Sequence, residues 1–167
     1  MPIYAKDPSG EFPKAPPGSH PAVCCDVVDL GTVSTHFGTY PAVRIVWQID
    51  ETQPNGKRYL VMKRYKNSLH PKSGLSIALT SWRGRAFTDE ERRGFDLEKL
   101  LGVNCIVSVT HKANDQGGVF VDVSSVSPPM RNQPRMEVED YIRVCDRTTE
   151  AHAAPHSDDP TDNEVPF

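Results

Sequence analysis

The stretch AVRIVWQIDETQPNGKRYLVMKRYK, residues 42–66, contains two β-strand patterns joined by a turn signal. In residues 42–50, polar side chains alternate with the apolar residues Val43, Ile45, Trp47 and Ile49. This period of two indicates a strand with one buried face, which places Trp47 in the core. Asn55-Gly56 is typical of a hairpin turn because both residues accept positive φ, and residues 57–66 follow as the next strand. The sequence therefore predicts two antiparallel neighbouring strands.

The chain on both sides of this hairpin continues the β pattern. Residues 22–33 (AVCCDVVDLGTV) are rich in β-branched and apolar side chains, and so are residues 103–111 and 119–126. The last two stretches are separated by the turn-rich residues 114–118, which favour a second hairpin. The sequence thus predicts five strands.

A helical segment is expected over residues 72–101, between the third and fourth strands. From Lys72 to Trp82, apolar residues recur at spacings of three and four. Thr88 and Glu91 form a capping-box pattern, and a last helical piece ends at Gly102, a residue typical of helix C-termini. The element order is therefore β-β-β-α-β-β.

This order is that of a five-stranded Greek-key barrel of the oligonucleotide-binding (OB) type, which carries its helix between the third and fourth strands. We therefore expect a mainly β, OB-type barrel. Element order does not establish closure of the sheet, so a plain antiparallel sheet with one helix and an SH3-like barrel are alternatives. The fold alone does not give the function.

Proline and charge divide the 167 residues into three parts. Six of the fifteen prolines lie in residues 1–21 and six in 128–167, and proline is kept out of sheet interiors. The net charge is 0 for residues 1–21, +2 for 22–127 and −5 for 128–167, which together give −3. We expect a proline-rich arm at 1–21, a folded domain at 22–147 and a disordered acidic tail at 148–167. Within the domain, residues 137–147 are expected to form a short strand or helix.

Several classes of protein and site lack support in the sequence. The first residues lack the charged start and apolar run of a signal peptide, so no export signal is expected, and no run of about 20 apolar residues that would span a membrane occurs. No C-x-x-C pair occurs, so reduced thiols are expected at Cys24, Cys25, Cys105 and Cys145. No motif of a catalytic serine, phosphate loop or zinc protease occurs. The histidines have no carboxylate or cysteine at ligand spacing: His20, His36, His70, His111, His152 and His156. We therefore expect no catalytic residue, metal or cofactor.

One interval of the domain carries charge of a single sign. Between Glu51 and Asp89 there is no acidic residue, whereas eight basic residues occur: Lys57, Arg58, Lys63, Arg64, Lys66, Lys72, Arg83 and Arg85. Clustered cations release counterions from a phosphate backbone, and aromatic rings stack on bases for roughly 1–3 kcal/mol per base. The interval is typical of a nucleic-acid-binding surface, although charges that only solvate a strand and a helix have a similar composition.

The strand at residues 57–66 has two faces, because side chains alternate along a strand. With Leu60 and Met62 in the core, the other face forms an outward strip of Tyr59, Lys63 and Tyr65. Trp82 is open to two interpretations, as a stacking residue on a basic loop or as a core residue. The expected DNA-binding residues are Lys57, Arg58, Tyr59, Lys63, Tyr65, Lys66, Lys72, Trp82, Arg83 and Arg85.

The last residues gather acids before an apolar tip: Asp158, Asp159, Asp162, Glu164, Val165, Pro166 and Phe167. This tip resembles the acidic C-terminal tip of bacterial and phage single-stranded DNA-binding proteins. Lys63-Arg64-Tyr65 and Trp82-Arg83-Gly84-Arg85 are similar to motifs of small phage replication proteins. The resemblance implies that the tip docks on replication, recombination and repair proteins. An apolar side chain flanked by acids also suits an apolar pocket with a basic rim.

The sequence therefore predicts a protein that binds single-stranded DNA without strong sequence preference. The resemblance implies a role in DNA replication, recombination and repair, in the cytoplasm of a bacterium or a phage-infected host. Expected partners are single-stranded DNA and the proteins recruited by the tip, with no membrane, and a homo-oligomer is compatible with the sequence. The alternatives are a protein-interaction adaptor and an RNA-binding OB-fold protein. A nuclease is the least favoured class.

Overall fold

The computed structural model describes residues 14–147, and it confirms the expected mainly β architecture. The elements in chain order are β1 (Gly18–Thr35), β2 (Gly38–Thr52), β3 (Arg58–Lys66), α1 (Gly74–Arg83), α2 (Asp89–Arg93), the 3-10 helix η2 (Leu97–Leu100), β4 (Asn104–Ala113) and β5 (Val119–Ser127). The first strand is longer than predicted, because it begins at Gly18 rather than at residue 22. All five expected strands and the helical insertion between the third and fourth are present.

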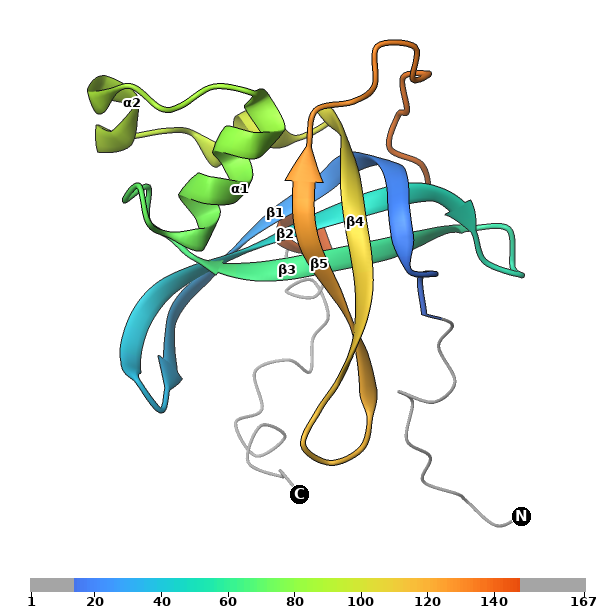
Figure 1. Ribbon diagram of the computed structural model, residues 1–167, viewed down its shortest axis with the longest axis horizontal. Helices are drawn as coiled ribbons and strands as arrows, with labels where there is room; N and C mark the ends of the chain where they lie inside the picture. Colours follow the sequence, from blue (N-terminus) through green and yellow to red (C-terminus); the bar gives the residue numbers. More distant parts are fainter. Residues whose placement is uncertain (1–13, 148–167) are drawn as a thin grey trace.

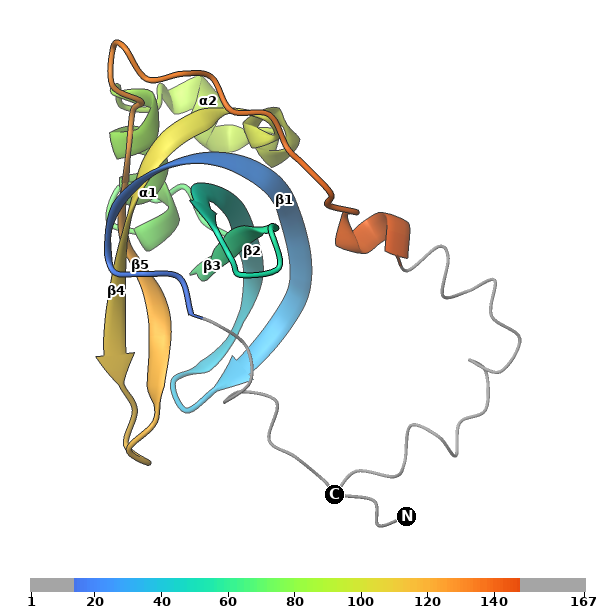
Figure 2. The same ribbon diagram turned by 90° about the vertical axis from the view of Figure 1, so that its right-hand side faces the viewer.

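The five strands form one antiparallel sheet in the order β3-β2-β1-β4-β5 (Figure 1). The strand β1 is shared, because residues 18–23 pair with β4 and residues 22–35 pair with β2. Figure 2 shows β1 curving around β2 and β3. The hairpins β1–β2 and β4–β5 project from the end of the sheet that lies away from the helices (Figures 1 and 2).

A closed barrel is not formed by the described strands. The strands β3 and β5 approach each other, but no ladder of backbone hydrogen bonds joins them within residues 14–147. The ammonium group of Lys63 on β3 instead donates to the carbonyl oxygen of Val123 on β5, at 2.8 Å. The sheet is therefore curled but open at this seam.

The core lies on the inner face of the curled sheet. Trp47 is fully buried, as its strand pattern predicts, and its ring lies 6.1 Å from that of Trp82 on α1. Burying an apolar side chain of this kind is worth roughly 1.5–3 kcal/mol. The two indoles therefore fasten α1 to the inner face of the sheet.

The helical insertion consists of three short pieces rather than one segment. Gly84 ends α1 with a left-handed φ of 77°, and its N–H binds the carbonyl of Thr80. The predicted capping box is confirmed, because Thr88 and Glu91 exchange hydrogen bonds at the start of α2. α1 packs against β3 and β5 and covers part of the open seam.

The β2–β3 turn differs from the predicted two-residue hairpin turn. Of Asn55 and Gly56, only Gly56 has positive φ, at 85°. The turn is closed by a hydrogen bond from Gln53 N to the carbonyl oxygen of Lys57, at 2.7 Å. The wider loop sets the register between β2 and β3.

Residues 136–147 lie across the outer face of β1 and β2 (Figure 2). Met136 binds Asn104 through two hydrogen bonds, and Glu139 does the same with the buried Gln48. The segment ends in one helical turn at residues 144–147, which agrees with the helical alternative for this stretch. It covers the part of the outer face around Asp26 and Gln48, which we call the covered half; the part around Arg44 and Arg64, which we call the open half, is not covered by residues 136–147.

All four cysteines are free thiols, and burial raises the pKa of Cys24, Cys25 and Cys105. Among residues 14–147, no helix has the length and apolar character needed to cross a membrane.

Candidate nucleic-acid interface

The two faces of β3 are the reverse of the sequence prediction. Val61 lies opposite Trp47 in the β2–β3 ladder, and cross-strand partners share a face of the sheet. Because Trp47 is in the core, Val61 and Tyr65 are buried, whereas Leu60 and Met62 are 40% and 45% exposed. The prediction that Leu60 and Met62 form the inner face is wrong. A register change of one residue exchanges the faces of a strand, and only the pairing with β2 decides between the two.

The predicted outward strip of Tyr59, Lys63 and Tyr65 is therefore not formed. Tyr65 is a core residue, and burial raises the pKa of its phenol. Tyr59 is half-buried and packs against the core. The ammonium group of Lys63 donates to the carbonyl oxygen of Val123 and lies 3.4 Å from the carboxylate of Asp122. Lys63 therefore connects β3 to β5.

The open half of the outer face carries two neighbouring arginines. Arg44 on β2 and Arg64 on β3 are direct partners in the ladder. Neither side chain has an ion pair or a hydrogen bond within residues 14–147. Like charges opposite each other destabilise a sheet, so this pair favours an anionic ligand. Exposed residues of β3 extend the same face: Leu60, Met62 and Lys66. We call these five residues the β2–β3 basic face.

A groove of about 420 Å³ continues from this face between β3, α1 and β5. Its walls carry three cations and three hydroxyl groups, from Lys63, Arg64, Lys66, Ser81, Ser124 and Ser125. Ammonium, guanidinium and hydroxyl donors are the groups that bind phosphate oxygens in nucleic-acid complexes. The groove and the β2–β3 basic face share Arg64 and Lys66, so they form one continuous cationic surface.

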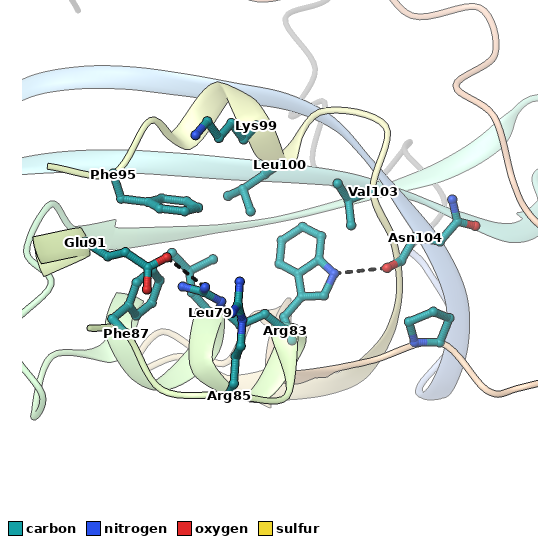
Figure 3. A pocket seen from close by; sticks show the side chains of 12 residues that line it. Leu79, Arg83, Arg85, Phe87, Glu91, Phe95, Lys99, Leu100, Val103 and Asn104 are labelled. Carbon is teal, nitrogen blue, oxygen red and sulfur yellow. Dashed lines mark hydrogen bonds and ion pairs between the residues drawn. The ribbon is translucent and has the colours of Figure 1, made fainter. Parts of the chain in front are cut away.

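Trp82 and Arg83 belong to a different region, an apolar pocket of about 500 Å³ beside the helices (Figure 3). Trp82 is buried, and its Nε1 donates to the carbonyl oxygen of Asn104 at 3.0 Å. Of its two interpretations, the core one is confirmed. The Arg83 guanidinium lies 4.4 Å from the centre of the Phe87 ring and 2.8 Å from Glu91. Figure 3 shows Arg83 directed toward Glu91 inside the pocket.

The Arg83–Glu91 contact is part of the helix cap. The pKa of Glu91 is lowered to about 2, chiefly by the hydrogen bond from the Thr88 backbone and next by that from Arg83. Burial opposes these effects but is weaker. Arg83 therefore supports the α2 terminus, and its charge is already compensated. Arg85 is exposed at the rim of the pocket.

The remaining predicted cations are dispersed. Arg58 donates to the carbonyl of Glu137 and forms an ion pair of 3.2 Å with Glu139, so it holds the C-terminal segment. Lys57 is exposed beside the β2–β3 turn, and Lys72 is exposed in the loop before α1. The structure thus brings Lys63, Arg64 and Lys66 together and separates them from the cations near the helices.

Two exposed phenylalanines were not expected from the sequence. Phe37, at the tip of the β1–β2 hairpin, is 100% exposed, and Phe120, near the tip of the β4–β5 hairpin, is 44% exposed. Exposed rings on projecting hairpins are suited to stacking on bases. The position of Phe37 between two predicted strands, beside Gly38, is the signal that indicates a turn rather than a core.

The predicted partner-binding residues from Asp158 to Phe167 lie outside the described residues, as do the arm residues 1–13. A scan of the chain against protein-family models finds no match. A search of curated proteins finds no match either.

Proposed function

We propose that this protein binds single-stranded DNA, without strong sequence preference, on the β2–β3 basic face. The observation that carries the proposal is the Arg44–Arg64 pair, two adjacent guanidinium groups that have no acidic partner among residues 14–147. A phosphate backbone supplies the missing negative charge at regular spacing and releases counterions on binding. Leu60 and Met62 add exposed apolar surface on which unpaired bases pack.

The topology supports an OB-type fold with its β3–β5 seam open. The strand order β3-β2-β1-β4-β5 and the helical insertion after β3 both agree with a partly open Greek-key barrel of five strands. In that fold, oligonucleotides bind the face of the second and third strands between the loops β1–β2 and β4–β5. We propose the corresponding site here, on the β2–β3 basic face beside the two projecting hairpins.

The hairpin phenylalanines favour a single strand over a duplex. Phe37 and Phe120 present rings to solvent on hairpins that project in the same direction. A single strand offers free base faces for such rings, whereas the bases of a duplex are already stacked and paired. Binding of a single strand through base stacking and phosphate contacts depends little on its base sequence.

We also propose, on the resemblance of the tip to those of single-stranded DNA-binding proteins, that residues Asp158 to Phe167 recruit replication, recombination or repair proteins. The acidic charges attract a basic surface over long range, and Phe167 fills an apolar pocket. In this role, the protein delivers partners to exposed single strands.

The test is a titration of fluorescein-labelled dT oligomers, followed by anisotropy, at two salt concentrations. A label is needed because Trp47 and Trp82 are both buried and report poorly on a surface ligand. We expect salt-sensitive binding that unlabelled duplex of equal length does not compete away. RNA of matched sequence is the third arm. A clear preference for RNA indicates the RNA-binding alternative, and absence of binding at low salt contradicts the proposal.

A protein-interaction adaptor is the second candidate, and the pocket in Figure 3 is the observation that favours it. Its walls include Phe87, Phe95 and Leu100, with Arg85 and Lys99 among the residues that line it. Such a pocket suits an apolar side chain next to a carboxylate. The adaptor hypothesis predicts no salt-dependent binding of the dT oligomer.

A further inference from the structure

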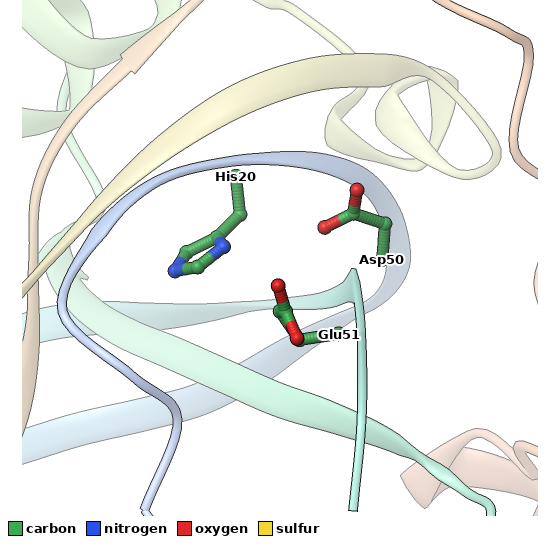
Figure 4. A group of neighbouring side chains, drawn as sticks. All are labelled: His20, Asp50 and Glu51. Atoms are coloured by element: carbon green, nitrogen blue, oxygen red, sulfur yellow. The ribbon is translucent and has the colours of Figure 1, made fainter.

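Three side chains with metal-binding atoms converge where β1 passes from β2 to β4. They are His20 on β1 and the consecutive carboxylates Asp50 and Glu51 near the end of β2 (Figure 4). One atom from each lies within 4.8 Å of the others. No sequence spacing indicates this group, because thirty residues separate the histidine from the acids.

The backbone explains how two consecutive acids reach one site. Neighbouring residues of a regular strand point to opposite faces. The β2–β3 ladder, however, has a register irregularity between Gln48 and Thr52, which includes both acids. Such irregularities bend a strand and redirect its side chains, often at functional sites. Figure 4 shows both carboxylates directed toward His20.

The imidazole of His20 is held in an orientation suited to metal binding. Its Nε2 lies 2.8 Å from the carbonyl oxygen of Pro16, which accepts but does not donate. Nε2 therefore donates to this carbonyl, and Nδ1 is the ring nitrogen that remains for a metal ion. A backbone carbonyl bound to the other ring nitrogen is the usual support of a histidine ligand. The ring is only 9% exposed, so this orientation is maintained by packing.

The charges of the group also favour a cation. Asp50 and Glu51 are exposed, and neither has an ion pair or a side-chain hydrogen bond within the described part of the chain. Two adjacent carboxylates repel each other, and a divalent cation between them removes this repulsion. Elsewhere in the structure, by contrast, the carboxylates of Asp122 and Glu91 have basic partners.

We propose that His20, Asp50 and Glu51 bind a divalent transition-metal ion of the Zn²⁺ class. One imidazole nitrogen and two carboxylate oxygens form a mixed donor set, and imidazole favours such ions over Mg²⁺ and Ca²⁺. Metal bonds of about 2.0–2.2 Å require the donor atoms to close from their present separation. The exposed carboxylates have the rotamer freedom to do this. Water fills the remaining coordination positions, and the ion fastens β1 to the end of β2.

The test uses the full chain after dialysis against a chelator, with Co²⁺ as a visible probe and Zn²⁺ as its competitor. We expect one equivalent of Co²⁺ to give the intense visible absorption of a tetrahedral or five-coordinate site, and Zn²⁺ to abolish it. Zn²⁺ is also expected to raise the melting temperature, because it binds only the folded state. Asp50→Asn and Glu51→Gln are each expected to weaken Co²⁺ binding at least about tenfold, as loss of a ligand does.

Matched controls separate this site from other histidines. His111→Gln removes a ring whose Nε2 also contacts a backbone carbonyl, that of Ala15, but which has no converging acids among the described residues. The double change His152→Gln/His156→Gln tests the tail. Both controls are expected to leave the Co²⁺ spectrum unchanged. Unchanged Co²⁺ affinity in Asp50→Asn and Glu51→Gln, or loss of the spectrum in either control, overturns the proposal. DNA binding is not required for either result.

Discussion

Charged side chains on the outer face of the sheet lie in two contrasting environments. Asp26, on the half covered by residues 136–147, is fully buried and receives hydrogen bonds from Tyr141, Arg143 and the backbone of Val144. On the open half, Arg44 and Arg64 lie opposite each other and have no acidic partner in the part of the chain that the structure describes. The first group uses charge to attach a segment of the chain. The second leaves its charge available to a ligand.

The pKa of Asp26 shows that its hydrogen bonds more than compensate for its burial. Burial by itself raises the pKa of this carboxyl, but the hydrogen bonds from Val144, Tyr141 and Arg143 outweigh burial and hold it below its usual range. Within residues 14–147, the arginine pair has no comparable partner. The proposed function therefore rests on charges without a partner on the folded surface rather than on the number of charges in a stretch of sequence.

The largest expected effect on stability comes from removing the buried carboxylate of Asp26 in the covered half. Asp26→Ala removes the acceptor of Tyr141 and of the Val144 N–H, while Arg143 keeps its ion pair with Glu98, and the lost hydrogen bonds should lower the free energy of unfolding by about 3 kcal/mol. Urea denaturation measures this change. The dT affinity of the folded protein should stay within twofold of the original, because the open half is untouched. A large loss of affinity would show that the two halves act together.

Removing the two arginines of the open half should have the opposite result, weaker DNA binding with little change in stability. Arg44→Ala/Arg64→Ala should weaken dT binding on the order of 30-fold, about 1 kcal/mol for each lost guanidinium. The salt dependence, as the slope of log K against log salt, should fall by about 1.4, since each phosphate contact on a single strand contributes roughly 0.7. Stability should be equal or slightly higher, because the repulsion is removed.

The matched control for the arginine pair is Arg131→Ala/Arg135→Ala, which removes the same charge from exposed positions elsewhere. It should change affinity far less than the double change on the basic face. Equal losses in both variants would mean that net charge, rather than the β2–β3 basic face, controls binding.

A smaller effect is expected from the hairpin tip. Phe37→Ala should cost about 1 kcal/mol of dT affinity, because one stacking platform is lost. Phe37→Leu keeps apolar surface without a ring and should lose nearly as much. Thermal unfolding should not change, because this side chain is fully exposed. Full affinity in both variants would remove the hairpin from the interface.

The smallest effect concerns the pH dependence of stability. The pKa of Asp26 is lowered in the folded state, so its contribution is present above its unfolded pKa of about 3.9 and is lost as the pH falls through the folded value. Tyr141→Phe removes one of the hydrogen bonds that lower this pKa, and should therefore reduce the loss of stability between about pH 5 and pH 2. Urea midpoints across this range measure the difference. An identical profile in the variant would mean that Tyr141 does not stabilise the carboxylate.

Local patterns predicted the elements well, because each pattern depends on neighbours in the sequence. The alternation around Trp47, the capping box at Thr88 and the helical spacing before Trp82 all correspond to observed elements. The orientation of β3 was not predictable in this way. Leu60-Val61-Met62 is apolar at every position, so its composition does not distinguish the two faces.

The sequence by itself determined the strand–helix order, the interval rich in basic residues and the burial of Trp47, since these follow from periodicity and composition. Only the tertiary structure decided which cations are free. Arg58, Lys63 and Arg83 are engaged by groups that lie 8 to 81 residues away along the chain, whereas Arg44, which lies outside the basic interval, pairs in register with Arg64. The availability of a charge depends on what folds against it, and strand register and chain crossing set that in three dimensions.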